Sequence, residues 1–287
     1  MNIKEILEQA AQYLEKHNID TPRLDAEVLL AEILDMERIK LYVNYDYPLK
    51  PKEKNLYRKW LKKRANRIPV AYITGKKEFM SLEFVVNEHV LLPRPETELL
   101  VEEIIDYCQE KEKSINMVDV GTGSGAIMVS LGHYIENARI LGIDISKEAV
   151  KITRKNIERH SLGDRLKVIN GDLLSPLVKR GTNNVNIVVS NPPYINEEDL
   201  SHLPPEVKKE PSLALDGGKK GLEIYQRLIP QADEVLMDNG LILLEFAPEQ
   251  AEEIKDLFSD HYKVELKEDH SGNLRYLIAV KNGVEGE

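Results

Sequence analysis

The sequence predicts an α/β fold in which a mostly parallel sheet follows a small helical domain. From about residue 95, short apolar runs of strand length alternate with segments of helical periodicity, which is typical of a parallel sheet with crossover helices. Residues 1–71 instead repeat their apolar side chains at helical spacing. The chain has 287 residues and 42% hydrophobic side chains, which is enough for two hydrophobic cores.

Helices are predicted throughout residues 1–71. One face of the first helix carries Ile3, Ile6, Leu7, Ala10, Tyr13 and Leu14. Thr21 and Pro22 have the residue types of an N-cap and a first helical position, and Pro51 begins another helix. In that last helix we expect Leu56, Trp60 and Leu61 to face inward.

Residues 72–94 alternate in a strand-like way, and we expect a β-hairpin linker there, followed by a domain over residues 95–287. A second hairpin is predicted at the end of that domain, from Tyr262–Leu266 and Leu274–Val280.

A glycine-rich turn follows the apolar run at 117–120. Gly121, Gly123 and Gly125, with Thr122 and Ser124 between them, precede an apolar stretch at 126–131. Such a strand-to-helix turn lets a ligand approach the backbone closely. Asp144 ends the next strand, ARILGID, where an acid accepts hydrogen bonds from ribose hydroxyls. This pattern suits NAD and S-adenosylmethionine equally well.

Two further acids narrow the choice of cofactor. Asp119 directly precedes the turn, and a carboxylate there favours a ligand with an ammonium or sulfonium group, as in S-adenosylmethionine. Asp172 and Leu173 follow the third strand, Leu166–Asn170, and are predicted to contact the adenine ring. The alternative for the last pair is an ordinary turn at the end of a strand.

The tetrapeptide Asn191-Pro192-Pro193-Tyr194 follows a fourth apolar run, Val185 to Ser190. Prolines have a fixed φ and no N–H, so their carbonyl groups are held rigidly and no local donor competes for them. Asn191 adds a side-chain acceptor and Tyr194 an aromatic face. Two acceptors and a stacking surface suit a ligand with a planar –NH2 group. The alternative interpretation of the tetrapeptide is a turn that merely ends the strand.

These motifs resemble class I S-adenosylmethionine-dependent methyltransferases that methylate planar nitrogens, with a Rossmann-like seven-stranded sheet. YITGKKEFMSLEFVVNEHVLLPRPETELLVE at 72–102, EPSLALDGG at 210–218 and GNLRYLIAV at 272–280 are similar to segments of the release-factor glutamine methyltransferases, the HemK family. The resemblance covers most of residues 70–280. Two positions depart from the family pattern, at Ala247-Pro248 and at Lys220, and both put only local loop shape in doubt.

The resemblance implies a substrate, a cofactor and a site. The substrate would be the glutamine of a Gly-Gly-Gln tripeptide in peptide chain release factors, methylated in the cytoplasm with S-adenosylmethionine. Asn191 and the Pro192 carbonyl would hold the glutamine amide, with Pro193 and Tyr194 completing the catalytic tetrapeptide, and Asn191 would also border the cofactor.

The sequence is also compatible with three alternative functions. A nucleic-acid methyltransferase acting on an exocyclic amine would use the same tetrapeptide, but the net charge of −12 over residues 91–287 disfavours a phosphate-binding surface. A ribosomal-protein glutamine methyltransferase is a second alternative. The third, a non-catalytic scaffold, would have no need of two rigid acceptors.

The remaining composition excludes other classes of site. The single cysteine, Cys108, cannot form an internal disulfide and is predicted to be buried. The seven histidines show no ligand spacing, so we expect no metal site, and no apolar run is long enough for a membrane span. Residues 50–67 contain nine basic side chains and one acid, which predicts either a solvated helix face or a docking surface for an acidic protein.

Overall fold

The computed structural model describes residues 1–109, 111 and 113–283. Its chain divides into two compact units, one of residues 1–76 and 204–209 and the other of residues 77–203 and 210–287. The predicted three-part division, with a separate linker over 72–94, stays a prediction. Among the described residues, no helix is both long and apolar enough to cross a membrane.

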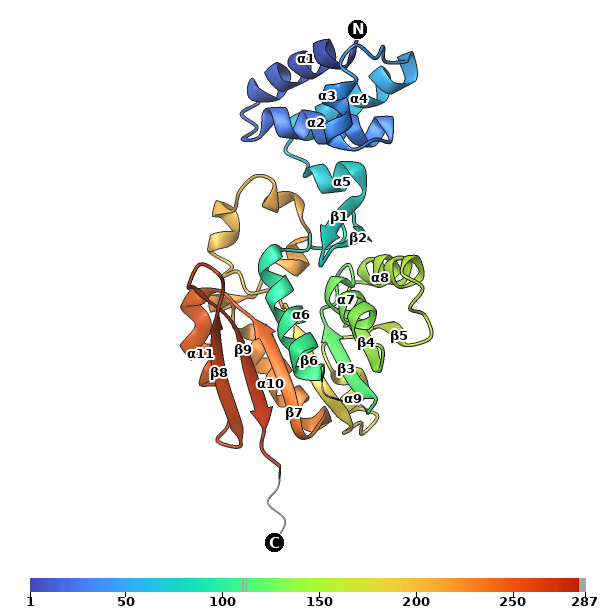
Figure 1. The fold of residues 1–287 in the computed structure, drawn as a ribbon. Helices are drawn as coiled ribbons and strands as arrows, with labels where there is room; N and C mark the ends of the chain where they lie inside the picture. Colours follow the sequence, from blue (N-terminus) through green and yellow to red (C-terminus); the bar gives the residue numbers. More distant parts are fainter. Residues whose placement is uncertain (110, 112, 284–287) are drawn as a thin grey trace. The chain divides into compact units, whose positions relative to one another are not determined.

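The first unit is helical, as predicted (Figure 1). It contains α1 (Ile3–Glu15), α2 (Pro22–Leu34), α3 (Arg38–Val43), α4 (Pro51–Ala65) and α5 (Val70–Thr74). Its core includes Leu7, Leu29, Leu30 and Tyr57, and the Tyr57 hydroxyl donates to the carbonyl of Ala26 at 2.8 Å.

Two expectations for α4 are wrong. Leu56 is 40% exposed, whereas its neighbour Tyr57 is fully buried. The inward face of this helix runs through Tyr57, Leu61 and Arg64, about 100° around the axis from Leu56. Arg64 therefore does not belong to the exposed basic face: it is buried against Asp25 at 2.6 Å and Glu206 at 2.9 Å.

The linker hairpin is present but shorter than predicted. It consists of β1 (Lys76–Phe79) and β2 (Leu82–Val85), and residues 72–74 belong to α5 instead. Pro69 is the N-cap of this helix, and Gly75, in a left-handed conformation with φ 79°, ends it. Within the second unit, the buried Asn156 side chain bonds both backbone groups of Val85 and so ties β2 to α8 (Lys147–Arg159).

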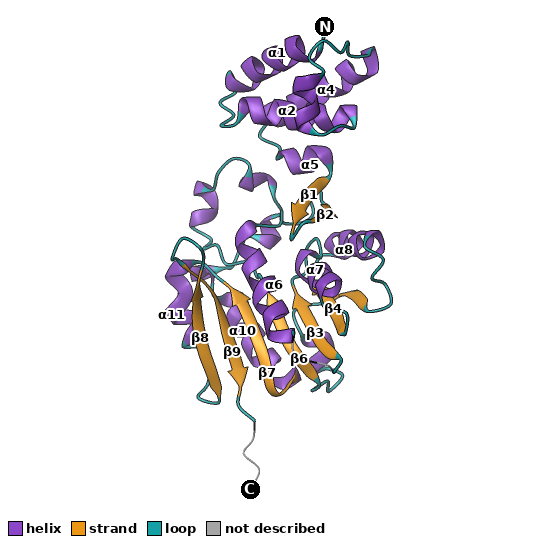
Figure 2. Cartoon of the chain, viewed as in Figure 1, coloured by secondary structure: helices purple, strands orange, loops and turns teal. Residues whose placement is uncertain are grey.

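The second unit is a seven-stranded sheet in the order β5-β4-β3-β6-β7-β9-β8, as the resemblance implies (Figure 2). The strands are β3 (Ile115–Val120), β4 (Ala138–Asp144), β5 (Leu166–Asn170), β6 (Val185–Ser190), β7 (Leu236–Glu245), β8 (Tyr262–Glu268) and β9 (Leu274–Lys281). The predicted terminal hairpin is confirmed, since β8 and β9 pair antiparallel; β9 also pairs antiparallel with β7.

Helices cover both faces of the sheet (Figure 1). The core on one face packs α9 (Ser175–Val178), α10 (Glu223–Val235) and α11 (Ala251–Lys255) against the strands. The other face carries α6 (Pro95–Cys108), α7 (Ala126–Tyr134) and α8. Cys108, at the end of α6, is buried as predicted. Because β3 to β7 are parallel, their carboxyl ends lie along one edge of the sheet.

Candidate functional site

The glycine-rich turn leaves β3 at this edge and leads into α7. Gly123 has a φ of 58°, a conformation that favours glycine. A Cβ atom on Gly123 would meet only the Gly121 carbonyl oxygen, 3.9 Å away, so this side of the turn is open. A Cβ on Gly125 would instead lie 2.9 Å from the Thr153 side chain, so the end of the turn is packed against α8. One side of the turn is therefore free to approach a ligand.

Asp144 connects this turn to the end of β4. Its Oδ2 atom accepts from the Gly123 N–H at 2.8 Å, and its Oδ1 atom accepts from the Ser146 N–H at 2.8 Å. The residue is only 8% exposed, and burial raises the pKa of its carboxyl above the usual value. A buried carboxylate with two backbone donors is rigid, and its remaining lone pairs suit a pair of ligand hydroxyls.

Asp119 lies beneath the turn. Its Oδ2 atom accepts from the Thr122 hydroxyl at 2.6 Å and from the Met128 N–H at 3.3 Å. Its Oδ1 atom has no hydrogen-bond partner among the described residues, although the side chain is buried, and burial raises the pKa to about 7. An unsatisfied buried acceptor fits a nearby cationic or hydrogen-bonding group of a ligand.

A pocket brings parts of the two sequence motifs together. Among the described residues, those that line it are His89, Val90, Leu91, Gly121, Gly123, Asp144, Ile145, Ser146, Ala149, Asn191, Pro193, Pro211, Leu213 and Ala214. Five of the predicted site residues line this pocket. Two belong to the glycine turn, two belong to the tetrapeptide, and the fifth is Asp144. Sequence reasoning missed Ile145 and Leu213, which are 54% and 55% exposed. Exposed apolar side chains beside a polar carboxylate suit a ligand with a flat, partly apolar ring.

The predicted adenine contacts lie outside the set of residues that line this pocket. Asp172 forms an ion pair with Arg227 of α10, and both side chains are about half exposed. Leu173 has a φ of 49° and packs at the margin of the core that contains α10. Thr122, Ser124 and Gly125 likewise shape the turn rather than line the pocket.

The tetrapeptide is fixed by a close backbone contact with the loop at 215–221. A Cβ on Gly217 would lie 2.8 Å from the Pro193 carbonyl oxygen, and one on Gly221 would clash with the Tyr194 carbonyl oxygen. The buried Gln250 side chain also donates to the Tyr194 carbonyl at 2.9 Å. Glycines at 217 and 221 are therefore required for this packing, and the tetrapeptide has a rigid backbone.

The Asn191 side chain is held from one end only. Its Nδ2 atom donates to Oγ1 of Thr97 at 3.0 Å, and the Thr97 hydroxyl donates to Oε2 of Glu245 at 2.7 Å. None of the hydrogen bonds among the described residues reaches Oδ1 of Asn191 or the Pro192 carbonyl oxygen. Both predicted acceptors are thus unpartnered among the described residues, but only Asn191 lines the pocket, whereas Pro192 is buried and does not.

Tyr194 borders a different hollow from Asn191. Its side chain lines a cavity together with Asn196, Asp199, Lys220, Glu249 and other residues. Burial, with the nearby negative charge of Glu245, raises the pKa of the phenol to about 12, so Tyr194 is neutral. The tetrapeptide therefore separates the pocket of the glycine turn from a second, acidic cavity.

Two residues of the site were not predicted to belong to it. Thr97 lies in the first turn of α6, within the PRPETE segment, and Glu245 is the last residue of β7. A carboxylate directly after the apolar run Leu241–Leu244, in the strand beside that of the tetrapeptide, was the available signal. The described residues contain no cluster of side chains suited to a metal ion.

Comparison with known proteins identifies the family of this chain. Residues 5–75 match the family described as PrmC N-terminal domain, and residues 95–203 match the methyltransferase small domain. A release factor glutamine methyltransferase from Clostridium acetobutylicum is 37% identical over 99% of this chain and 100% of that protein. The chain belongs to the release factor glutamine methyltransferase family.

A second relative supports the family, and a solved structure supports the fold. The release factor glutamine methyltransferase of Geobacter sulfurreducens is 39% identical over 90% of this chain and 88% of its own length. Among solved structures, a methyltransferase from Pyrococcus furiosus is 18% identical and covers 72% of this chain and 92% of its own, with a TM-score of 0.53. That likeness identifies the methyltransferase fold.

Proposed function

We propose that this protein transfers a methyl group from S-adenosylmethionine to the side-chain amide nitrogen of a glutamine in the Gly-Gly-Gln segment of peptide chain release factors. The observation that carries the proposal is the pocket that joins the open side of the glycine turn and Asp144 to Asn191 and Pro193. The names of the full-length relatives supply the substrate class.

The cofactor would be held mainly by backbone and by Asp144. Gly121 and Gly123 would let it approach the turn, Asp144 would accept from its ribose hydroxyls, and Ile145 and Leu213 would pack against its ring. We also propose Asp119 as an acceptor for its methionine portion, through the unpartnered Oδ1 atom. When bound, S-adenosylmethionine supplies an electrophilic methyl group.

Asn191 and Pro192 would orient the nucleophile. An amide nitrogen is a weak nucleophile because its lone pair is delocalised into the carbonyl group, so the site must supply alignment. Oδ1 of Asn191 and the Pro192 carbonyl would accept the two amide hydrogens and hold the nitrogen in line with the methyl group. Alignment of this kind contributes on the order of 7–11 kcal/mol. The same acceptors stabilise the positive charge that grows on the nitrogen, which then loses a proton to water.

The partner and the compartment follow from the proposed substrate. A release factor acts during translation, so we place the reaction in the cytoplasm. The acidic balance of residues 91–287 supports a protein substrate over a nucleic acid. We propose the helical domain as the part that recognises the release factor.

The experiment offers the protein four substrates in parallel with S-adenosylmethionine: a release factor, the same release factor with its Gly-Gly-Gln glutamine replaced by alanine, ribosomal proteins and DNA. Mass spectrometry then locates the added methyl group. We expect one methyl group on the glutamine amide of the intact release factor only. Methylation of ribosomal protein or DNA instead would refute the proposed substrate.

A further inference from the structure

The amide group of Asn191 has two chemically opposite ends. Its oxygen accepts hydrogen bonds, and its nitrogen only donates them. A substrate –NH2 group needs the oxygen, because a rotation of the amide by 180° would set two donors against each other. Something must therefore select one orientation.

Thr97 and Glu245 supply that selection. A hydroxyl has a single hydrogen, and that of Thr97 donates to the Glu245 carboxylate at 2.7 Å. Oγ1 of Thr97 is left as an acceptor, and it faces Nδ2 of Asn191 at 3.0 Å. A carboxylate can only accept, so when Glu245 is ionised the direction of both hydrogen bonds is determined.

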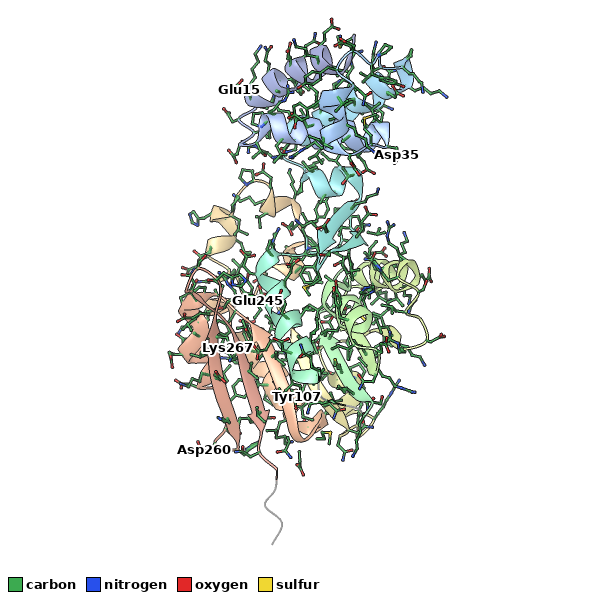
Figure 3. All side chains as sticks on the ribbon, viewed as in Figure 1. Glu15, Asp35, Tyr107, Glu245, Asp260 and Lys267 are labelled. Atoms are coloured by element: carbon green, nitrogen blue, oxygen red, sulfur yellow. The ribbon has the colours of Figure 1, made fainter. Side chains whose placement is uncertain are left out.

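The burial of Thr97 and Glu245 strengthens this preference for one orientation of the Asn191 amide. Thr97 is 4% exposed and Glu245 is 1% exposed, so water is not available to exchange with either partner. Figure 3 labels Glu245 near the end of the sheet beside α6, the helix that carries Thr97 in its first turn. Ser190 of β6 pairs with Leu244 of β7, so Asn191 and Glu245 are neighbours at the ends of adjacent strands.

We propose that Thr97, itself held by Glu245, is a positioning residue that keeps the carbonyl oxygen of Asn191 turned toward the substrate amide. The inference rests on the proposed function, because it assumes that Asn191 receives an –NH2 group. Thr97 acts through Asn191 and does not itself contact the substrate.

The test compares Thr97→Val, which keeps the shape but removes the hydroxyl, with Thr97→Ser, which keeps the hydroxyl. At pH 8, single-turnover methylation of whole release factor should fall on the order of 10- to 100-fold in Thr97→Val. Thr97→Ser should recover most of that loss. Affinity for S-adenosylhomocysteine, measured by calorimetry, should be unchanged in both variants.

Two further variants separate positioning from a general structural effect. If Thr97 acts only through Asn191, adding Thr97→Val to Asn191→Ala should cause no further loss of rate. If Thr97→Val folds poorly because Glu245 is stranded, Thr97→Val with Glu245→Met removes the stranded carboxylate and keeps the same test.

The orientation of the amide also has a direct readout that needs no reaction. The side-chain amide resonances of Asn191, assigned by their loss in Asn191→Asp, should shift in Thr97→Val and remain in place in Thr97→Ser. Turnover of Thr97→Val within twofold of wild type, together with unshifted resonances, would overturn the inference. Failure of the wild-type protein to methylate release factor would instead overturn the proposed function, while the resonances would still report the orientation.

Discussion

The Gly123 backbone N–H donates to Oδ2 of Asp144 at 2.8 Å, so the glycine turn and the acid at the end of the next strand form one unit. Ile143, which directly precedes this acid, accepts from the Gly121 N–H at 2.8 Å. The carboxylate thus has a fixed position relative to the open side of the turn. Changes at Asp144 should therefore act on cofactor binding first.

Asp144→Ala is expected to weaken the binding of S-adenosylhomocysteine by about 1.5–3 kcal/mol, the usual value of a hydrogen bond to a charged group. The variant also frees the N–H groups of Gly123 and Ser146, which should loosen the turn. Calorimetry measures the affinity. Asp260→Ala, an exposed site far along the sequence, is the control, and equal affinity in all three proteins would contradict the assignment of this pocket.

Asn191→Ala should lower the single-turnover rate strongly while leaving cofactor affinity nearly unchanged. The substitution removes one of two acceptors, so the target amide is free to rotate away from the methyl group. Rapid-quench assays at saturating substrate measure the rate. Asn183→Ala, an exposed asparagine on the same chain, should behave as wild type, and a rate near wild type in Asn191→Ala would refute the role.

The exposed basic face of α4 should affect docking and not chemistry. Lys59, Lys62 and Lys63 are exposed and have no ion-pair partner among the described residues. Replacing all three by glutamate should raise the KM for whole release factor and flatten its salt dependence, because less attraction remains for salt to screen. A short Gly-Gly-Gln peptide should react as before.

The matched control for that surface replaces the same three lysines by arginine, which keeps the charge. Its KM should stay close to the wild-type value. Equal losses on peptide and whole protein in the glutamate variant would indicate a damaged fold, and no loss on either would leave α4 as a solvated face.

Glu245→Gln should change how stability depends on pH. Burial raises the pKa of Glu245 to about 7 in the folded protein, from an ordinary value of 4.5, and the hydrogen bond from Thr97 and the charge of Arg275 only partly oppose this effect. A raised pKa means that the folded state binds the proton more tightly. The contribution to the free energy of unfolding is therefore full below pH 4.5 and is lost as the pH rises to about 7.

Glu245→Gln has no carboxyl group to ionise and so does not lose this part of its free energy of unfolding. Its stability relative to wild type should therefore rise by about 3 kcal/mol between pH 4 and pH 8. Urea unfolding at several pH values gives the difference. Glu268→Gln, at an exposed position, should show no such trend. Parallel curves for Glu245→Gln and wild type would mean that this carboxyl titrates normally.

Local patterns in the sequence were enough to predict most of the second unit. The predicted strands ending at Asp144, Asn170 and Ser190 coincide with β4, β5 and β6. A buried parallel strand is an apolar run bounded by turn residues, and that pattern needs no knowledge of partners. For the same reason the glycine turn and the tetrapeptide were visible as motifs, although their roles toward ligands stay predictions.

Contacts between side chains of distant segments were not predictable from the sequence. Thr97 lies between Asn191 and Glu245, residues that are far apart in the chain. Asp172 likewise pairs with Arg227 from a distant helix. In α4, periodicity identified a helix but placed Leu56 inward, whereas packing against α2 chose Tyr57.

The sequence by itself determined which segments form strands and helices and which motifs stand at strand ends, because these depend on neighbours along the chain. The tertiary structure alone decided which end of the Asn191 amide is free and which basic residues of α4 are buried, as Arg64 is against Asp25. Both outcomes depend on hydrogen-bond and charge partners that folding brings together from far along the chain, so no local pattern records them.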